Sequence, residues 1–105
     1  MIASTRAITD LFLERVQLYV DQDSAKLSKA HRGFIHGREH ACRAIASMLT
    51  DGTQQEALVK KLINLAGVDE ELSVGAFRKK DVFWGNFHLG RYWEQMAAAI
   101  ELRHA

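Results

Sequence analysis

The sequence predicts an all-α protein, a single compact domain of four to five helices packed as an irregular or orthogonal bundle. Three observations predict this fold. The chain has 105 residues, a length typical of one domain. Apolar residues recur every three or four positions through most of it, which is the spacing of a helix with one buried face. It has no proline, and its seven glycines lie mostly between the periodic segments. The predicted domain spans residues 1–105.

The composition is that of an ordinary globular protein, with 48% hydrophobic and 26% charged residues and a formal net charge of +1. This balance argues against disorder. The single cysteine, Cys42, excludes an internal disulfide framework and a four-cysteine zinc site. A single cysteine fits a reducing compartment, so we expect a cytoplasmic location. We expect no signal peptide and no membrane span, because charged residues interrupt every apolar run.

The first helix is expected from Ser4 or Thr5 to Val20, since either hydroxyl can cap it. Its apolar residues cover a broad arc, namely Ile8, Leu11, Phe12, Val16, Leu18, Tyr19 and Val20. An arc this wide predicts a helix contacted on two sides, by other helices or by a second subunit. Self-association therefore stays open.

The second helix is expected from a cap at Ser28 to a glycine stop at Gly52. Its predicted buried face is small and apolar: Ala30, Phe34, Gly37, Ala41, Ile45 and Met48. Its opposite face is basic and bears histidines: Arg32, His36, Glu39, His40 and Arg43. The small residues Gly33, Gly37 and Ala41 recur every four positions, and this favours close approach of another helix, either within the chain or from a partner.

A capping box at Thr53–Glu56 predicts the start of a third helix, which buries Leu58, Leu62 and Ala66 and stops at Gly67. A short helix should follow to about Lys80, and its buried residues would be Leu72, Val74 and Phe77. The last helix is expected from about Asp81 to Leu102. Its predicted buried stripe is Leu89, Trp93, Met96 and Ile100, and its glycines allow a kink or an early break at Gly85 or Gly90.

One stretch of the second helix, His36-Gly-Arg-Glu39-His40, spells the H-x-x-E-H pattern of inverted zinc proteases. Two histidines four positions apart can chelate one ion, and the glutamate can act as a base. Such enzymes need a third ligand from a distant helix and a larger body, and here both histidines lie opposite the apolar face. We therefore predict no metal and no cofactor, and leave adventitious surface binding of a metal by His36 and His40 open.

Two features support an alternative interpretation, a nucleic-acid-binding protein. The basic face of the second helix could contact phosphates. Residues 54–80 also have the outline of a degenerate helix-turn-helix that closes on Arg78, Lys79 and Lys80. Against this, Asp69, Glu70 and Glu71 open the supposed recognition helix, where phosphates would repel them.

Six of the nine aromatic residues fall within seventeen positions: Phe77, Phe83, Trp84, Phe87, Tyr92 and Trp93. Aromatic residues at helical spacing usually belong to a core, and we assign Phe87 and Trp93 to it. Phe83, Trp84 and Phe87 cannot all point inward from one helix, so Trp84 is expected at a surface, a kink or a subunit contact.

No nucleophile–base pair, phosphate-binding glycine loop or dinucleotide motif is present, so we predict a non-enzymatic protein. The favoured function is binding to another macromolecule, with a protein partner preferred over nucleic acid, as for a regulator, adaptor or inhibitor encoded by a phage or plasmid. The predicted partner-binding residues are Arg32, His36, His40, Arg43, Arg78, Lys79, Lys80, Trp84 and Arg91.

Overall fold

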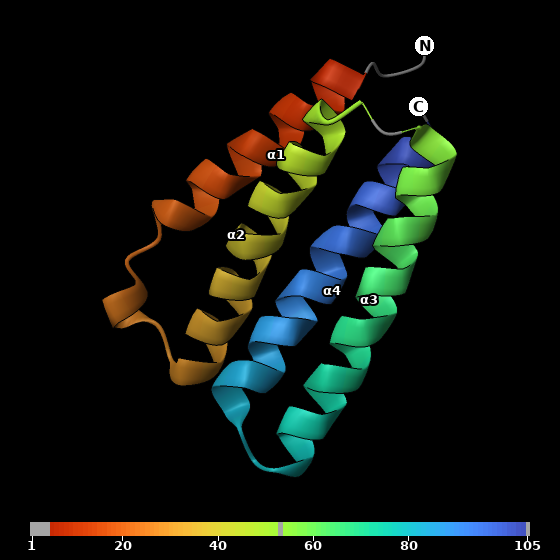
Figure 1. Cartoon of the computed structure of the whole chain (residues 1–105). Helices are drawn as coiled ribbons and strands as arrows, with labels where there is room; N and C mark the ends of the chain where they lie inside the picture. Colours follow the sequence, from red (N-terminus) through yellow and green to blue (C-terminus); the bar gives the residue numbers. More distant parts are fainter. Residues whose placement is uncertain (1–4, 53, 105) are drawn as a thin grey trace.

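Figure 1 shows the computed structural model of the chain, which describes residues 5–52 and 54–104. Within these residues the predicted all-α fold is confirmed, and no strand is present. The helices are α1 (Thr5–Val20), α2 (Lys29–Thr50), α3 (Gln55–Arg78) and α4 (Val82–Arg103), with one turn of 3₁₀ helix at Ser24–Lys26. None of the described helices is long and apolar enough to cross a membrane.

The helices lie side by side in the order α1, α2, α4, α3, so the last helix of the chain sits between the second and the third (Figure 1). Because successive helices alternate in direction, α2 and α4 run parallel (Figure 1). The molecule measures 42 × 28 × 22 Å. Because α2 and α3 flank α4, the residues of α4 that can contact a partner lie on its two remaining sides.

Most of the predicted helix ends are confirmed. The Ser28 side chain accepts a hydrogen bond from the His31 backbone N–H and caps α2, and Gly52 adopts a φ of 74° just after that helix. The Asp81 side chain likewise caps α4 by accepting from the Trp84 N–H. The predicted capping box begins at Thr53, which lies outside the described residues.

The predicted break in the third helix is wrong, because α3 continues through Gly67 to Arg78. Its buried residues keep helical spacing on both sides of the glycine, as Leu62, Ala66, Asp69 and Ser73 show. The packing of α3 against α4, both before and after Gly67, outweighs the cost of about 1 kcal/mol that a glycine adds to a helix. The predicted helix-turn-helix at 54–80 is therefore also wrong. Leu72, Val74 and Phe77, predicted to be buried, are 42–48% exposed.

The predicted buried stripe of the last helix is also wrong. Trp93 is 57% exposed and Ile100 is 55% exposed, while Leu89 and Met96 are only half-buried. The buried side chains and glycines of α4 are instead Gly85, Gly90, Glu94, Gln95, Ala98, Ala99 and Leu102. The helix runs unbroken through both glycines.

The predicted close approach along the small residues of α2 is confirmed, and the neighbouring helix is α4. A methyl group added to Gly33 would collide with the backbone oxygen of Phe83, and one added to Gly37 would collide with that of Phe87. On the other side of the contact, a methyl group on Gly90 would meet the backbone oxygen of Phe34. Glycine on both helices therefore lets the two backbones touch.

The buried face of α2 is wider than predicted. Phe34 and Met48 are half-buried, whereas Ile35, Cys42 and Leu49 lie fully inside, because α1 covers a second side of this helix. The core combines residues from all four helices, among them Phe12, Ile45, Leu62 and Ala98. Leu18 and Val20 extend the apolar arc of α1 but are 64% and 46% exposed, so none of the described helices covers them.

Candidate binding surface

A buried carboxylate joins α4 to the first two helices. Glu94 is fully buried, and one of its oxygens, Oε1, accepts three hydrogen bonds: from Tyr19 at 2.7 Å, from Arg38 at 2.8 Å and from Arg15 at 3.0 Å. The second oxygen lies 3.0 Å from Arg15 Nε in an ion pair that lacks hydrogen-bond alignment. Two guanidinium groups therefore compensate one internal charge, and this compensation allows a glutamate in the core.

The protonation states in this cluster follow from burial and from the surrounding charges. Burial opposes the charge of Glu94, but hydrogen bonds from Arg15, Tyr19 and Arg38 outweigh it and hold the pKa of the carboxyl below its ordinary value. Burial and the neighbouring Glu94 raise the pKa of the Tyr19 hydroxyl and of the Cys42 thiol. Both groups therefore stay protonated at neutral pH, and Cys42 is an inert core residue.

A second buried carboxylate joins α3 to α4. Asp69 receives hydrogen bonds from Gln95 Nε2 at 2.8 Å and from Arg91 Nε at 3.2 Å, and it lies 2.8 Å from His88 Nδ1. An Asp–His pair of this kind can orient a catalytic base. The neighbouring hydroxyl of Ser73 donates to the Gly85 backbone oxygen at 2.7 Å, and no hydrogen bond among the described residues links it to the pair. Its evident role is to hold α3 against α4.

Where α2 meets the first half of α4, aromatic rings and histidines gather at the surface. Trp84 and Phe87 have ring centroids 5.0 Å apart, and the His40 ring lies 5.8 Å from that of Phe87. His40 also accepts a hydrogen bond from Arg91, the same side chain that contacts Asp69. We name this region the aromatic–histidine surface, defined as His36, His40, Phe83, Trp84, Phe87, His88 and Arg91.

A groove of about 300 Å³ adjoins this surface between the end of α3 and the start of α4. Trp84, which is 49% exposed, and His88 belong to both the surface and the groove. Three of the remaining lining residues are apolar or small, namely Leu72, Gly75 and Ala76, and three are charged, namely Glu71, Lys79 and Asp81. A partner segment could therefore contact the rings and a cation together.

The structure brings together only part of the predicted partner-binding set. His36, His40, Trp84 and Arg91 share the aromatic–histidine surface, and Trp84 is exposed as predicted. Lys79 joins them through the groove.

The other predicted residues lie elsewhere or stand alone. Arg78 and Lys80 are exposed at the turn between α3 and α4, where Lys80 has a φ of 60°. Arg43 pairs with Glu39 at 3.2 Å along the surface of α2 and borders a different hollow, lined in part by residues of α1. Arg32 is half-buried, and its Nε has no hydrogen-bond partner among the described residues.

The prediction omitted Phe83, Phe87 and His88 as members of the surface. Their spacing in the sequence could have indicated them. Phe87 is four positions after Phe83 and His88 four after Trp84, so each pair lies side by side on a helix. What the sequence could not supply was the position of α2. Its His36 lies near the Phe83 ring, with centroids 6.3 Å apart, only because Gly33 lets the backbones meet.

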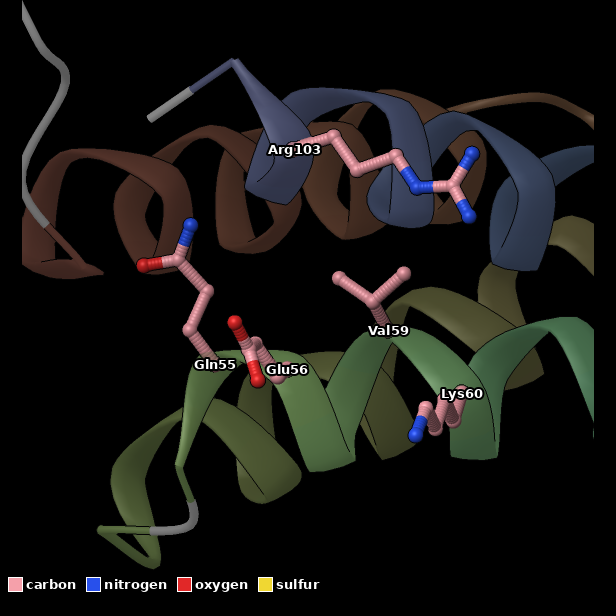
Figure 2. Close-up of a pocket in the computed structure, with 5 residues that line it drawn as sticks. All are labelled: Gln55, Glu56, Val59, Lys60 and Arg103. Atoms are coloured by element: carbon pink, nitrogen blue, oxygen red, sulfur yellow. The ribbon is translucent and has the colours of Figure 1, made fainter.

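Figure 2 shows another hollow, of about 370 Å³, between the start of α3 and the end of α4. Gln55, Glu56, Val59 and Lys60 line it from below and Arg103 from above, and the Lys60 ammonium points away from the space. Gln55 donates its amide hydrogen to the Leu102 backbone oxygen. The charged groups do not converge on one point, so this hollow offers no specific site.

The zinc-protease pattern does not assemble a metal site. Glu39 pairs with Arg43, and the guanidinium of Arg91 lies beside His40, where a metal ion would meet a like charge. Among the residues that the structure describes, no three histidine, cysteine or acidic side chains are grouped so that they could hold an ion.

Comparison with known protein families, with curated proteins and with solved structures found no match for this chain. Its function must therefore be inferred from the surface alone.

Proposed function

We propose that the chain is a non-enzymatic binding protein of the cytoplasm, a regulator, adaptor or inhibitor, that recognises a partner protein through the aromatic–histidine surface. The observation that carries this proposal is the cluster of partly exposed rings around Trp84, beside a groove lined by both apolar and charged residues. Tryptophan, tyrosine and arginine dominate the binding energy of protein interfaces. A tryptophan that is half exposed and held by neighbouring rings loses little conformational entropy on binding.

The charges around the groove favour a partner segment that is acidic as well as apolar. Lys79 lines the groove, Arg78 and Lys80 are its neighbours in the sequence, and all three are exposed. Two acids of the lining, Glu71 and Asp81, oppose these three cations, and Asp81 also caps α4, so one positive charge remains in the balance. An acidic peptide with a large apolar side chain would therefore place that side chain against Trp84 and its carboxylates near Lys79.

The proposal can be tested by selecting binders from a random peptide library displayed on phage. We expect enriched peptides to combine Asp or Glu with Trp, Phe or Leu, and to bind the protein with measurable affinity by isothermal titration. Trp84→Glu should weaken that binding at least ~10-fold, because it removes a central aromatic and repels an acidic ligand. Lys79→Glu should weaken it and also reduce its salt dependence.

The matched control is Trp93→Glu, the same substitution on the opposite side of the same helix. It should leave peptide affinity unchanged. Failure to enrich any peptide, or equal affinities for the wild type and Trp84→Glu, would contradict the proposal. Salt-dependent binding of a single-stranded 20-mer oligonucleotide that Trp84→Glu abolishes would overturn it in favour of nucleic-acid recognition.

A further inference from the structure

The side of α4 that faces away from the core carries a continuous apolar pattern. Val82, Asn86, Leu89, Trp93, Met96 and Ile100 are separated by four, three, four, three and four positions, the spacing at which one helix packs against another. We name these six residues the outer stripe. Trp93, Ile100 and Val82 are 57%, 55% and 42% exposed, and the other three are half-buried. At 1.5 Å per residue the stripe is about 27 Å long.

No charged residue belongs to the outer stripe. The ionisable side chains of α4 between Asp81 and Glu101, apart from Tyr92, are His88, Arg91 and Glu94. All three turn toward other helices: His88 and Arg91 contact Asp69 of α3, and Glu94 contacts α1 and α2. A solvent-facing side of a helix normally carries the charges, so this arrangement is reversed. An apolar surface of this extent marks an interaction site.

The other described helices leave the outer stripe uncovered. On one flank α2 contacts α4 through Gly90, and on the other the Phe77 ring of α3 lies over Gly85. The remaining helix, α1, reaches α4 mainly through the hydrogen bonds of Arg15 and Tyr19 to Glu94. Phe77 itself is 42% exposed and extends the apolar area at the start of the stripe.

We propose that the outer stripe is the interface between two copies of this chain, whose α4 helices pack antiparallel about a two-fold axis. A second copy fits the stripe because antiparallel pairing sets its apolar residues against apolar residues of the other copy, and no charged side chain of the stripe is left buried without an opposite charge. An axis between Glu94 and Gln95 places Trp93 opposite Met96 of the second copy and Leu89 opposite Ile100. Both layers are then apolar, and the first joins an aromatic ring to a thioether.

The ends of the stripe fit the same arrangement. That axis sets Asn86 of one copy opposite Arg103 of the other, so that a guanidinium can donate to an amide oxygen at each end. A single polar residue in an apolar stripe commonly fixes the register of helix pairing.

This dimer would leave the aromatic–histidine surface free. Trp84 and Trp93 are nine positions apart, about two and a half helical turns, and so lie on opposite sides of α4. The dimer would therefore present two copies of the partner-binding surface, and its formation does not depend on the proposed function being right.

The test is the mass in solution, measured by sedimentation velocity between about 1 and 100 μM. We expect the wild type to sediment at twice the mass of the chain. Trp93→Glu should sediment as a monomer, with the dissociation constant raised at least ~100-fold by two buried carboxylates facing an apolar partner. Trp84→Glu is the matched control and should remain dimeric, because it places the same charge on the same helix away from the stripe.

Two further measurements keep the result decisive. Circular dichroism checks that Trp93→Glu is folded, and Ile100→Glu replaces it if it is not. In a Cys42→Ala background, the pair Leu89→Cys with Ile100→Cys should form a covalent dimer under oxidation, whereas Leu89→Cys alone should not. A monomeric wild type throughout this range, or a dimer that both stripe variants leave intact, would overturn the proposal. Crosslinking by Leu89→Cys alone would overturn the antiparallel arrangement.

Discussion

The two sides of α4 have opposite chemistry and opposite environments. The inner side has the same three-and-four spacing as the outer stripe and consists of His88, Arg91, Gln95, Ala98 and Leu102. It contains the more polar residues, yet it faces the other helices, whereas the outer stripe of largely apolar residues faces solvent. The apolar content of a side therefore did not decide which side of this helix was buried. Specific partners on the neighbouring helices decided it.

The contacts centre on two carboxylates, Glu94 of α4 and Asp69 of α3, and on a set of glycines. Glu94 meets two arginines and a tyrosine from α1 and α2, and Asp69 meets a histidine, an arginine and a glutamine from α4. Each polar group on the inner side thereby gains a donor or acceptor that a rotated helix would lose, and an unpaired buried charge costs several kcal/mol. Gly33 and Gly37 then fix how closely α2 can approach.

The largest change in the free energy of unfolding is expected for a substitution of Glu94. Glu94→Gln keeps the shape of the side chain but leaves Arg15 and Arg38 without their counter-ion, so the free energy of unfolding should fall by about 3–5 kcal/mol at neutral pH. Both guanidinium groups retain some contact with solvent, which favours the lower end of that range. Urea denaturation followed by circular dichroism measures the loss.

The stabilisation by Glu94 should also depend on pH. Because the pKa of Glu94 is lower in the folded protein than in the unfolded chain, its stabilisation is complete above the unfolded value of about 4.3 and is lost as pH falls through the folded value. Wild type and Glu94→Gln should therefore converge in acid. Glu101→Gln, the same change at an exposed position of α4, should stay within about 0.5 kcal/mol of wild type at every pH.

A second pair of variants compares the two sides directly. Leu102→Ala should lower the free energy of unfolding by about 3 kcal/mol, because Leu102 is 2% exposed and its removal leaves a cavity. Ile100→Ala, two positions away on the outer stripe, should change the stability of the monomer by less than about 0.5 kcal/mol. Denaturant titration at a protein concentration too low for dimer formation measures both. Equal losses would show that the outer stripe is covered within one chain.

A smaller effect is expected where α2 contacts α4. Gly37→Ala should destabilise the protein by about 2 kcal/mol, since the added methyl group collides with the Phe87 backbone, which cannot move without separating the helices. The gain in helix propensity of about 1 kcal/mol offsets only part of this cost. Thermal unfolding measured by calorimetry checks the direction.

The control for Gly37→Ala is a second glycine substitution, which should stabilise the protein. Gly67 lies in the middle of α3 with open space around it, so Gly67→Ala should stabilise the protein by about 1 kcal/mol through helix propensity alone. If both substitutions were stabilising, the backbone contact between α2 and α4 would not be as close as described.

Local signals in the sequence predicted the helix ends well, because capping depends on residues a few positions apart. Ser28, Gly52 and Asp81 act as their chemistry suggests. The break predicted at Gly67 failed because the packing that keeps α3 continuous comes from α4, which follows later in the chain. Periodicity identified Trp93 and Ile100 as a stripe, but periodicity alone cannot say whether a stripe faces the core or another subunit.

The candidate surface was predictable in part for the same reason. Exposed histidines on α2 and an exposed Trp84 followed from helical spacing. Their meeting required α4 to lie between α2 and α3, an arrangement that no short-range pattern encodes. Arg43 was grouped with them by charge, yet it pairs with Glu39 on its own helix.

The buried position of Cys42 makes its thiol a natural probe of transient opening of the fold. The only thiol of the chain is fully buried, and it lies close enough to Arg15 of α1 and Glu94 of α4 to interact with both. A thiol reagent can reach it only when α1 lifts away or the whole core opens. Its labelling rate relative to that of an unfolded chain therefore measures the free energy of that opening, without any engineered probe.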